Sequence, residues 1–254
     1  MLLSVAAVSS SNHTPTPTLE RIFLQVIPYV PRGKAPQELQ LTTNDTMVAI
    51  GDSITVEGSY LDYVEQVLAA NYPKLNKFKI VNAGKGGHRA EHLIARFASD
   101  VIACHPSLVM INVGINDVAF RLEEPHQLEV FKAYRENVDK MVEMAQSAGI
   151  RVILLAPTII QEDPNAPGNL RLPLYAHAMR VIADSKQCQF VDLHAMFLSA
   201  LRHRSPQSQG RWLTLDGIHM RPLGSALMAL GVLRALGVPD AKIAATAIDV
   251  SQSW

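Results

Sequence analysis

The sequence predicts a doubly wound α/β fold built around a parallel β-sheet. Short apolar runs alternate along the chain with longer amphipathic stretches, which is the repeating order strand, helix, strand. The chain has 254 residues, of which 48% are hydrophobic, and this is enough to bury one sizeable core. We therefore expect a single principal α/β domain.

Five apolar runs are the expected strands of this sheet. They span residues 47–51, 79–82, 108–113, 151–156 and 189–193. After the third run the apolar positions change to a spacing of three and four, which lines one face of a helix: Phe131, Tyr134, Val138, Met141, Ala145 and Ala148. The last helix has Pro222 in its first turn, and Gly237 and Pro239 close it.

The principal domain is expected to span residues 46–240. Residues 1–45 hold clusters of Ser, Thr and Pro around one apolar patch at 22–30, so they are an N-terminal extension. Residues 241–254 are expected to be a C-terminal tail. The first residues are apolar but lack the positive charge of a secretory signal, and the sequence leaves the compartment open.

Charge and cysteine content exclude several kinds of partner. Lys and Arg together number 23, as do Asp and Glu, so no basic field for nucleic acid is present. Cys104 and Cys188 have neither disulfide-framework nor zinc-site spacing. No apolar run is long enough to span a membrane. A small, neutral substrate fits this composition best, and the oligomeric state is left open.

Ligands of open α/β sheets bind at the carboxyl ends of the strands. Four polar or glycine-rich loops are expected at this side of the sheet. Three of them follow the first three strands, and the fourth precedes the last helix. Their sequences are Gly51-Asp52-Ser53, Gly84-Lys85-Gly86-Gly87, Gly114-Ile115-Asn116-Asp117 and Asp216-Gly217-Ile218-His219. These loops carry the candidate site.

Ser53, His219 and Asp216 are the candidate nucleophile, base and acid. A serine hydroxyl needs an adjacent base at neutral pH, and that base needs an acceptor to hold its tautomer. Asp216 and His219 lie three residues apart, so one turn can place the carboxylate on Nδ1 while Nε2 faces Ser53.

Attack on an ester carbonyl also requires fixed donors for the developing oxyanion. The candidates are the backbone N–H groups of Ser53 and Gly87 and the side-chain amide of Asn116. A glycine suits this role because it permits close backbone approach and positive φ. Gly84 and Gly86 are neighbouring glycines that could take the same role.

The motifs G-D-S-I-T, N-A-G-K-G-G, G-I-N-D and D-G-I-H, in this order, resemble the four blocks of the SGNH (GDSL-type) hydrolases. The resemblance covers about residues 47–237. It implies a flavodoxin-like three-layer α/β/α sandwich, neither metal nor organic cofactor, and hydrolysis of short acyl esters, often acetyl groups on carbohydrates. It also implies a triad of Ser53, His219 and Asp216, with Gly87 and Asn116 joining Ser53 in the oxyanion hole. The family often has Asp after its glycine, whereas His88 follows Gly87 here.

Ordinary structural roles compete for some of these residues. Ser53 could be a helix N-cap, with a helix beginning near Ser59. Asp117 is expected to be a turn residue, because Asp bonds its own backbone in loops. Asp52 is expected to bond backbone and fix the loop before Ser53.

Two other functions remain as alternatives. His88, Glu91 and His92 match the H-x-x-E-H pattern of a zinc peptidase class, with Glu91 as general base. However, His88 directly follows the glycines and is expected in a loop or first turn. The other alternative is a carbohydrate-binding relative that has lost turnover.

The substrate is not readable from the sequence. Residues 120–127, 158–173 and 204–213 are the segments expected to shape the pocket, because their content of Pro, Gly and Asn indicates loops. Trp212 could stack on a sugar ring or pack in the core.

Overall fold

Five parallel strands form the central sheet, in the order β2-β1-β3-β4-β5. The structure is a computed structural model that describes residues 27, 35–36, 38–125, 127–204 and 209–246. The strands are β1 (Thr46–Gly51), β2 (Lys79–Gly84), β3 (Leu108–Asn112), β4 (Arg151–Leu155) and β5 (Gln189–Val191). The predicted five-stranded parallel sheet is confirmed.

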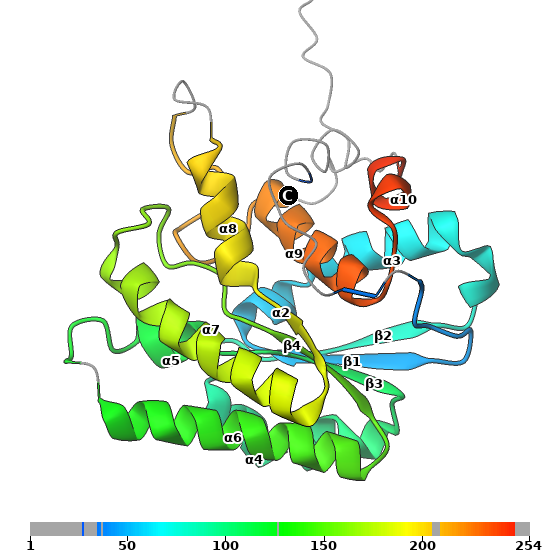
Figure 1. Cartoon of the computed structure of the whole chain (residues 1–254), viewed down its shortest axis with the longest axis horizontal. Helices are drawn as coiled ribbons and strands as arrows, with labels where there is room; N and C mark the ends of the chain where they lie inside the picture. Colours follow the sequence, from blue (N-terminus) through cyan, green and yellow to red (C-terminus); the bar gives the residue numbers. More distant parts are fainter. Residues whose placement is uncertain (1–26, 28–34, 37, 126, 205–208, 247–254) are drawn as a thin grey trace, which may run out of the picture.

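Helices cover both faces of the sheet (Figure 1). On one face lie α3 (Ser59–Asn71), α8 (Leu193–Arg202), α9 (Pro222–Ala235) and α10 (Asp240–Ala244). On the other, α6 (Leu128–Ser147) packs against α4 (Ala90–Asp100) and α7 (Pro167–Lys186). Short helices at strand ends and in connections are α2 (Ser53–Glu57), η2 (Pro73–Leu75), η3 (Ile102–Cys104) and α5 (Ile115–Ala119). The predicted three-layer α/β/α architecture is therefore confirmed.

The core lies between the sheet and each helix layer. β3 is buried along its whole length, as expected for a central strand covered on both faces. The predicted apolar face of α6 is buried through Tyr134, Val138, Met141 and Ala145. Phe97 of α4 is fully buried beneath the same face of the sheet, and burial of one such side chain stabilises the fold by roughly 1.5–3 kcal/mol.

Gly84, the last residue of β2, allows α2 to lie across the strand ends. A Cβ atom at this position would lie 2.3 Å from the backbone nitrogen of Val56, which no side chain could accommodate. The edge of β2 and the helix that begins at Ser53 are therefore in direct backbone contact, and this contact brings the second loop to the first.

Several element boundaries differ from the sequence-based predictions. β5 ends at Val191 instead of 193, because the Asp192 side chain accepts a hydrogen bond from Ala195 N–H and begins α8 there. β3 and β4 each end one residue earlier than predicted. A helix begins at Ser53, ahead of the one that begins at Ser59.

The described parts of the two terminal segments pack against the principal domain. Leu41 is buried, and Gln40 N–H donates to Leu236 O at 2.8 Å. Ile243 of α10 is buried as well. Most of 1–45, including most of the apolar patch at 22–30, lies outside the described residues, so the division at 46 and 240 stays a prediction. Within the described ranges, no helix is both long and apolar enough to cross a membrane.

Candidate active site

Ser53 is the first residue of α2, directly after β1. Asp52 caps this helix, because its Oδ1 accepts a hydrogen bond of 3.0 Å from Ile54 N–H. The N-cap interpretation of Ser53 is thus wrong, and the prediction that Asp52 fixes the loop through the backbone is confirmed. The Ser53 hydroxyl is hydrogen-bonded instead to a ring nitrogen of His219.

The structure brings Asp216 and His219 together with Ser53 at hydrogen-bond distances. His219 Nε2 lies 2.9 Å from Ser53 Oγ, and His219 Nδ1 lies 2.6 Å from Asp216 Oδ2. Asp216 Oδ1 accepts from the backbone N–H groups of Ile218 and His219 at 2.9 and 2.8 Å. A carboxylate on Nδ1 requires the proton there, so the lone pair of neutral Nε2 faces the serine hydroxyl.

Electrostatics favour an ionised Asp216 beside this imidazole. Partial burial raises the pKa of Asp216, but hydrogen bonds from His219 and from two backbone N–H groups lower it by more. The resulting pKa is about 2. Burial lowers the pKa of His219, whereas the bond to Asp216 and the charges of Glu57, Asp216 and Asp52 raise it. The net effect is a raised pKa. The site therefore stabilises an imidazolium cation.

The three candidate oxyanion donors come from the ends of three adjacent strands, β2, β1 and β3. Gly87 has φ of 73°, which favours glycine. Asn116 is buried, and its Nδ2 donates to His88 O at 3.1 Å, joining the loops after β2 and β3. Because a side-chain amide has two hydrogens, this bond leaves one for a substrate.

A comparison with known protein families identifies the family of the chain. The model of the GDSL-like lipase/acylhydrolase family matches residues 49–227, a range that includes all four motif loops. The chain belongs to the GDSL-like lipase/acylhydrolase family. The predicted SGNH (GDSL-type) resemblance is thereby confirmed, and the protein is a carboxylic ester hydrolase of this family.

Relatives of this GDSL-like hydrolase include an acetylxylan esterase from Geobacillus stearothermophilus. It is 29% identical over 217 residues, which are 78% of this chain and 97% of the relative. The crystal structure of Axe2, an acetylxylan esterase from the same organism, aligns with a TM-score of 0.70 at 28% identity, covering 80% of this chain and 98% of Axe2. LAE5, an α/β hydrolase enzyme from the metagenome of Lake Arreo, aligns with a TM-score of 0.70 at 27% identity over 79% and 98% of the two chains. Three Axe2 structures are described as catalytic mutants, in which a serine, an aspartate or a histidine is replaced by alanine.

Two buried carboxyl groups of the GDSL-like hydrolase lie beneath the site. Burial raises the pKa of Asp52 to about 7, and the nearby charge of Asp117 adds to this. Burial likewise raises the pKa of Asp117 to about 6. The prediction that Asp117 is an ordinary turn residue is wrong, because it lies buried in α5 and both its oxygens accept from Ala90 N–H at 3.3 Å. Asp117 thus holds the N-terminus of α4 against α5, the short helix that also carries Asn116.

The residues of the zinc alternative are engaged in other contacts. His88 lies in the loop before α4, as predicted, and its Nδ1 accepts from Arg96 Nε at 3.2 Å. His92 Nδ1 accepts from Arg89 N–H at 3.1 Å, and Glu91 pairs with Arg89 at 2.5 Å. Over the part of the chain that the structure describes, no group of three His, Cys, Asp or Glu side chains is arranged to hold a metal ion. These contacts do not favour the zinc alternative.

Glu57 is a neighbour of His219 that sequence reasoning missed. Its Oε1 lies 3.8 Å from Nε2, the nitrogen that faces Ser53. Glu57 follows Ser53 by four residues on α2, so both side chains lie on one helix face. Recognition that a helix begins at Ser53 would have revealed this neighbour.

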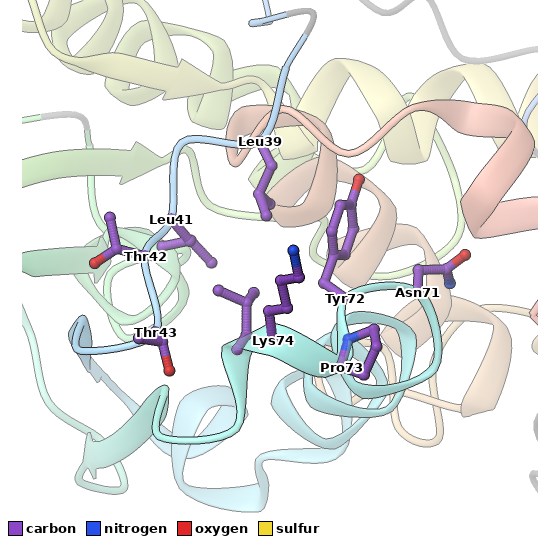
Figure 2. Close-up of a pocket in the computed structure, with 9 residues that line it drawn as sticks. Leu39, Leu41, Thr42, Thr43, Asn71, Tyr72, Pro73 and Lys74 are labelled. Carbon is purple, nitrogen blue, oxygen red and sulfur yellow. The ribbon is translucent and has the colours of Figure 1, made fainter.

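A separate hollow of about 510 Å³ has a lining that includes neither Ser53 nor His219. Figure 2 shows the side chains that line it. It is lined by the segment before β1, including Leu39 and Leu41, and by Tyr72 and Lys74 at the end of α3 and in η2. Since β1 begins only at Thr46, this hollow lies at the amino-terminal ends of the strands. Ser53 lies at the opposite, carboxyl-terminal ends of the strands.

Trp212 and part of the second segment predicted to shape the pocket make contacts within the fold. Trp212 packs partly buried against the core, which confirms the packing alternative. Residues 160–163 contact Asn169 of α7 through three hydrogen bonds, made by Ile160 N–H, Gln161 O and Asp163 O. Residues 205–208 of the third segment lie outside the described residues.

Proposed function

We propose that the protein is a serine esterase that removes acetyl groups from acetylated carbohydrates, with Ser53 as nucleophile. The observation that carries this proposal is the continuous series of contacts from Asp216 to His219 to Ser53, at 2.6 and 2.9 Å. A mutated serine, aspartate and histidine in the Axe2 catalytic mutants support the same set of side chains. The name of the curated relative, acetylxylan esterase, supports the acetylated carbohydrate as substrate.

In the first half of the reaction, His219 Nε2 takes the proton of Ser53 Oγ as the oxygen attacks the ester carbonyl. Asp216 stabilises the imidazolium that forms. The developing oxyanion accepts hydrogen bonds from the N–H groups of Ser53 and Gly87 and from the Asn116 amide, each worth about 3–4 kcal/mol. His219 then gives its proton to the departing alcohol, and an acetyl group remains on Ser53.

In the second half, water replaces the alcohol. His219 Nε2 takes a proton from this water, and the resulting hydroxide attacks the acetyl carbonyl at the same donors. Collapse of the tetrahedral intermediate breaks the bond to Ser53 Oγ, which recovers its proton from His219. The products of this half are acetate and the unchanged enzyme, and water is the only reactant consumed besides the ester.

Covalent labelling tests this proposal directly. A serine-directed fluorophosphonate is expected to modify one residue per chain and to abolish release of acetate from acetylated xylo-oligosaccharides. Mass spectrometry of the digested protein should place the label on Ser53. Labelling of another serine together with loss of activity would assign the nucleophile elsewhere, and full activity after labelling of Ser53 would refute the mechanism. A purified protein without any ester hydrolysis would favour the non-catalytic binding alternative.

Glu57→Gln is expected to shift the pH profile of kcat/KM. His219 acts as a base only when neutral, so activity falls as the pH decreases through its raised pKa. Removal of the charge at Glu57 lowers the pKa of His219, because that charge is one of the groups that raise it. The acid limb should therefore move to lower pH, and initial rates from pH 4 to 9 would measure the shift. An unchanged or oppositely shifted limb would contradict this.

Phe120→Ala is expected to weaken sugar binding selectively. Phe120 is 62% exposed, and a Cβ added to Gly87 would lie 3.9 Å from the tip of its ring, so the ring lies beside a proposed oxyanion donor. Loss of an aromatic contact worth about 0.5–1.5 kcal/mol should raise KM for acetylated xylo-oligosaccharides by about 3- to 10-fold. The kcat/KM for p-nitrophenyl acetate, which has no sugar, should stay within about twofold.

Val181→Ala is the matched control, since Val181 is also an exposed apolar residue, on α7. It should leave both substrates unaffected. Equal losses of Phe120→Ala on both substrates would mean that the ring does not contact the sugar.

A further inference from the structure

The Asp216–His219 turn is held in place by a loop that the proposed mechanism does not use. Residues 213–221 form a small turn in which Thr214 and Met220 pair as an antiparallel bridge. Leu215 N–H donates to His219 O at 2.8 Å, which closes this turn. Because the turn is far from Ser53 in the sequence, its position relative to the nucleophile depends on contacts with the rest of the fold.

Glu162, in the loop after β4, makes the most concentrated of these contacts. Its Oε1 accepts from Leu213 N–H and Thr214 N–H, each at 2.7 Å, and from Thr214 Oγ1 at 2.9 Å. Its Oε2 accepts from Trp212 N–H at 2.7 Å. Three consecutive backbone N–H groups that converge on one carboxylate form an anion-binding nest.

This carboxylate is buried. The Glu162 side chain is only 6% exposed, and Arg204 Nη1 lies 3.6 Å from Oε2 as the neighbouring positive charge. Hydrogen bonds to an ionised acceptor are about twice as strong as neutral ones, and burial excludes the water that would compete for them. The contact is therefore strong enough to fix residues 212–214, which lead into the turn.

The loop that carries Glu162 is itself rigidly attached to α7 through Asn169. This side chain is buried; its Oδ1 accepts from Ile160 N–H at 2.9 Å, and its Nδ2 donates to Asp163 O at 2.7 Å. In addition, Gln161 N–H donates to Gly217 O at 2.7 Å, inside the Asp216–His219 turn. A continuous path of contacts thus leads from α7 through Glu162 to the proposed base.

We propose that Glu162 is a positioning residue that holds the Asp216–His219 turn in register with Ser53, an inference that rests on the proposed function. It touches none of the three side chains of the triad and acts through the backbone of residues 212–214. A displacement of about 1 Å between reacting groups can reduce a rate about 100-fold, so such a contact affects turnover more than substrate binding.

Glu162→Gln is the variant that tests this role. An amide keeps the size of the side chain but puts a donor where a carboxylate oxygen accepts, so it faces at least one backbone N–H group without an acceptor. We expect kcat for p-nitrophenyl acetate to fall by about 10- to 100-fold, with KM within about twofold. Loosening of the Asp216 contact should also move the acid limb of the pH profile to lower pH, since that contact raises the pKa of His219.

Asp163→Asn is the matched control. It removes the same charge one residue further along the loop, where the side chain is exposed and, among the described residues, accepts from Asn165 N–H of its own loop. It should retain the wild-type kcat and pH profile. If Glu162→Gln behaves like this control, even with a lower Tm, the residue is merely structural and the proposal is overturned.

Proton NMR separates this proposal from the proposed function. The wild type should show a downfield Nδ1–H resonance of His219, from its 2.6 Å bond to Asp216. This resonance should broaden or disappear in Glu162→Gln and persist in Asp163→Asn, whether or not any ester is hydrolysed. An intact resonance in Glu162→Gln would overturn the positioning role, whereas a wild type inactive on all esters would overturn only the proposed function.

A second pair of variants serves if Glu162→Gln does not fold. Thr214→Val removes one of the four donors to Glu162, and Thr214→Ser retains it. We expect Thr214→Val to lose about threefold in kcat and to shift the acid limb to lower pH, as Glu162→Gln does. Thr214→Ser should keep the wild-type turnover. Equal turnover in both would count against the role of Glu162.

Discussion

Ser53→Ala is expected to reduce kcat for acetate esters by about 10⁴- to 10⁶-fold, because no oxygen then remains to form the acetyl intermediate. The donors proposed for the oxyanion would still bind substrate, so KM should change much less than kcat. Stopped-flow or long-time initial-rate assays with p-nitrophenyl acetate measure this loss. The fluorophosphonate should no longer label the protein.

Ser59→Ala is the matched control for this substitution. Ser59 is also the first residue of a helix, α3, so its replacement likewise removes a serine hydroxyl from the first position of a helix. It should leave turnover unchanged. If Ser53→Ala kept a tenth or more of the wild-type rate, the serine mechanism would be excluded and an activated water would have to take the place of the nucleophile.

Asp216→Asn is expected to lower kcat by about 10³- to 10⁴-fold although it changes a single atom. Oδ1 of Asp216 accepts from two backbone N–H groups, so the amide oxygen should stay on that side. The NH2 group then faces His219 Nδ1 and donates to it, which forces the ring proton onto Nε2. The nitrogen that faces Ser53 becomes a donor and can no longer take the serine proton.

Glu57→Gln separates this tautomer effect from loss of charge. It also removes a carboxylate near the imidazole, 3.8 Å from Nε2, but leaves the Nδ1 contact intact. At the pH optimum it should retain turnover within about threefold of the wild type, because it shifts a pKa without reversing a hydrogen bond. If Asp216→Asn lost no more activity than Glu57→Gln, the orienting role of Asp216 would be wrong.

Sequence patterns were sufficient for the sheet and for the loops that carry Ser53, Gly87, Asn116, Asp216 and His219. Each of these predictions depends on local information: apolar runs for buried strands, and short motifs whose residues lie on one turn. Position at the carboxyl end of parallel strands then brings the first three loops together, because β2, β1 and β3 are adjacent in the sheet. The contacts of His219 with Ser53 and Asp216 agree with these predictions, and the catalytic roles of the residues stay proposals.

Residues that act through burial or distant contacts were not predictable in this way. Asp117 has the sequence context of a turn residue, and only the approach of α4 gives its carboxylate a partner in Ala90 N–H. Glu162 lies in a segment whose composition indicates a variable loop, yet its partners are about fifty positions away, at residues 212–214. No local pattern marks such a contact, because the two segments meet only after the sheet has formed.

The buried carboxyl of Asp52 makes the stability of the fold depend on pH in the opposite direction to the turnover proposed for His219. Its pKa rises from the ordinary value of 3.8 to about 7 in the folded chain, so the native state binds this proton more tightly than the unfolded one. The stability it contributes is fully present below pH 3.8 and is lost as the pH rises towards 7. The turnover proposed for a neutral His219 should increase as the pH rises, so the conditions expected to make the enzyme fastest are those in which the Asp52 carboxyl stabilises the native state least.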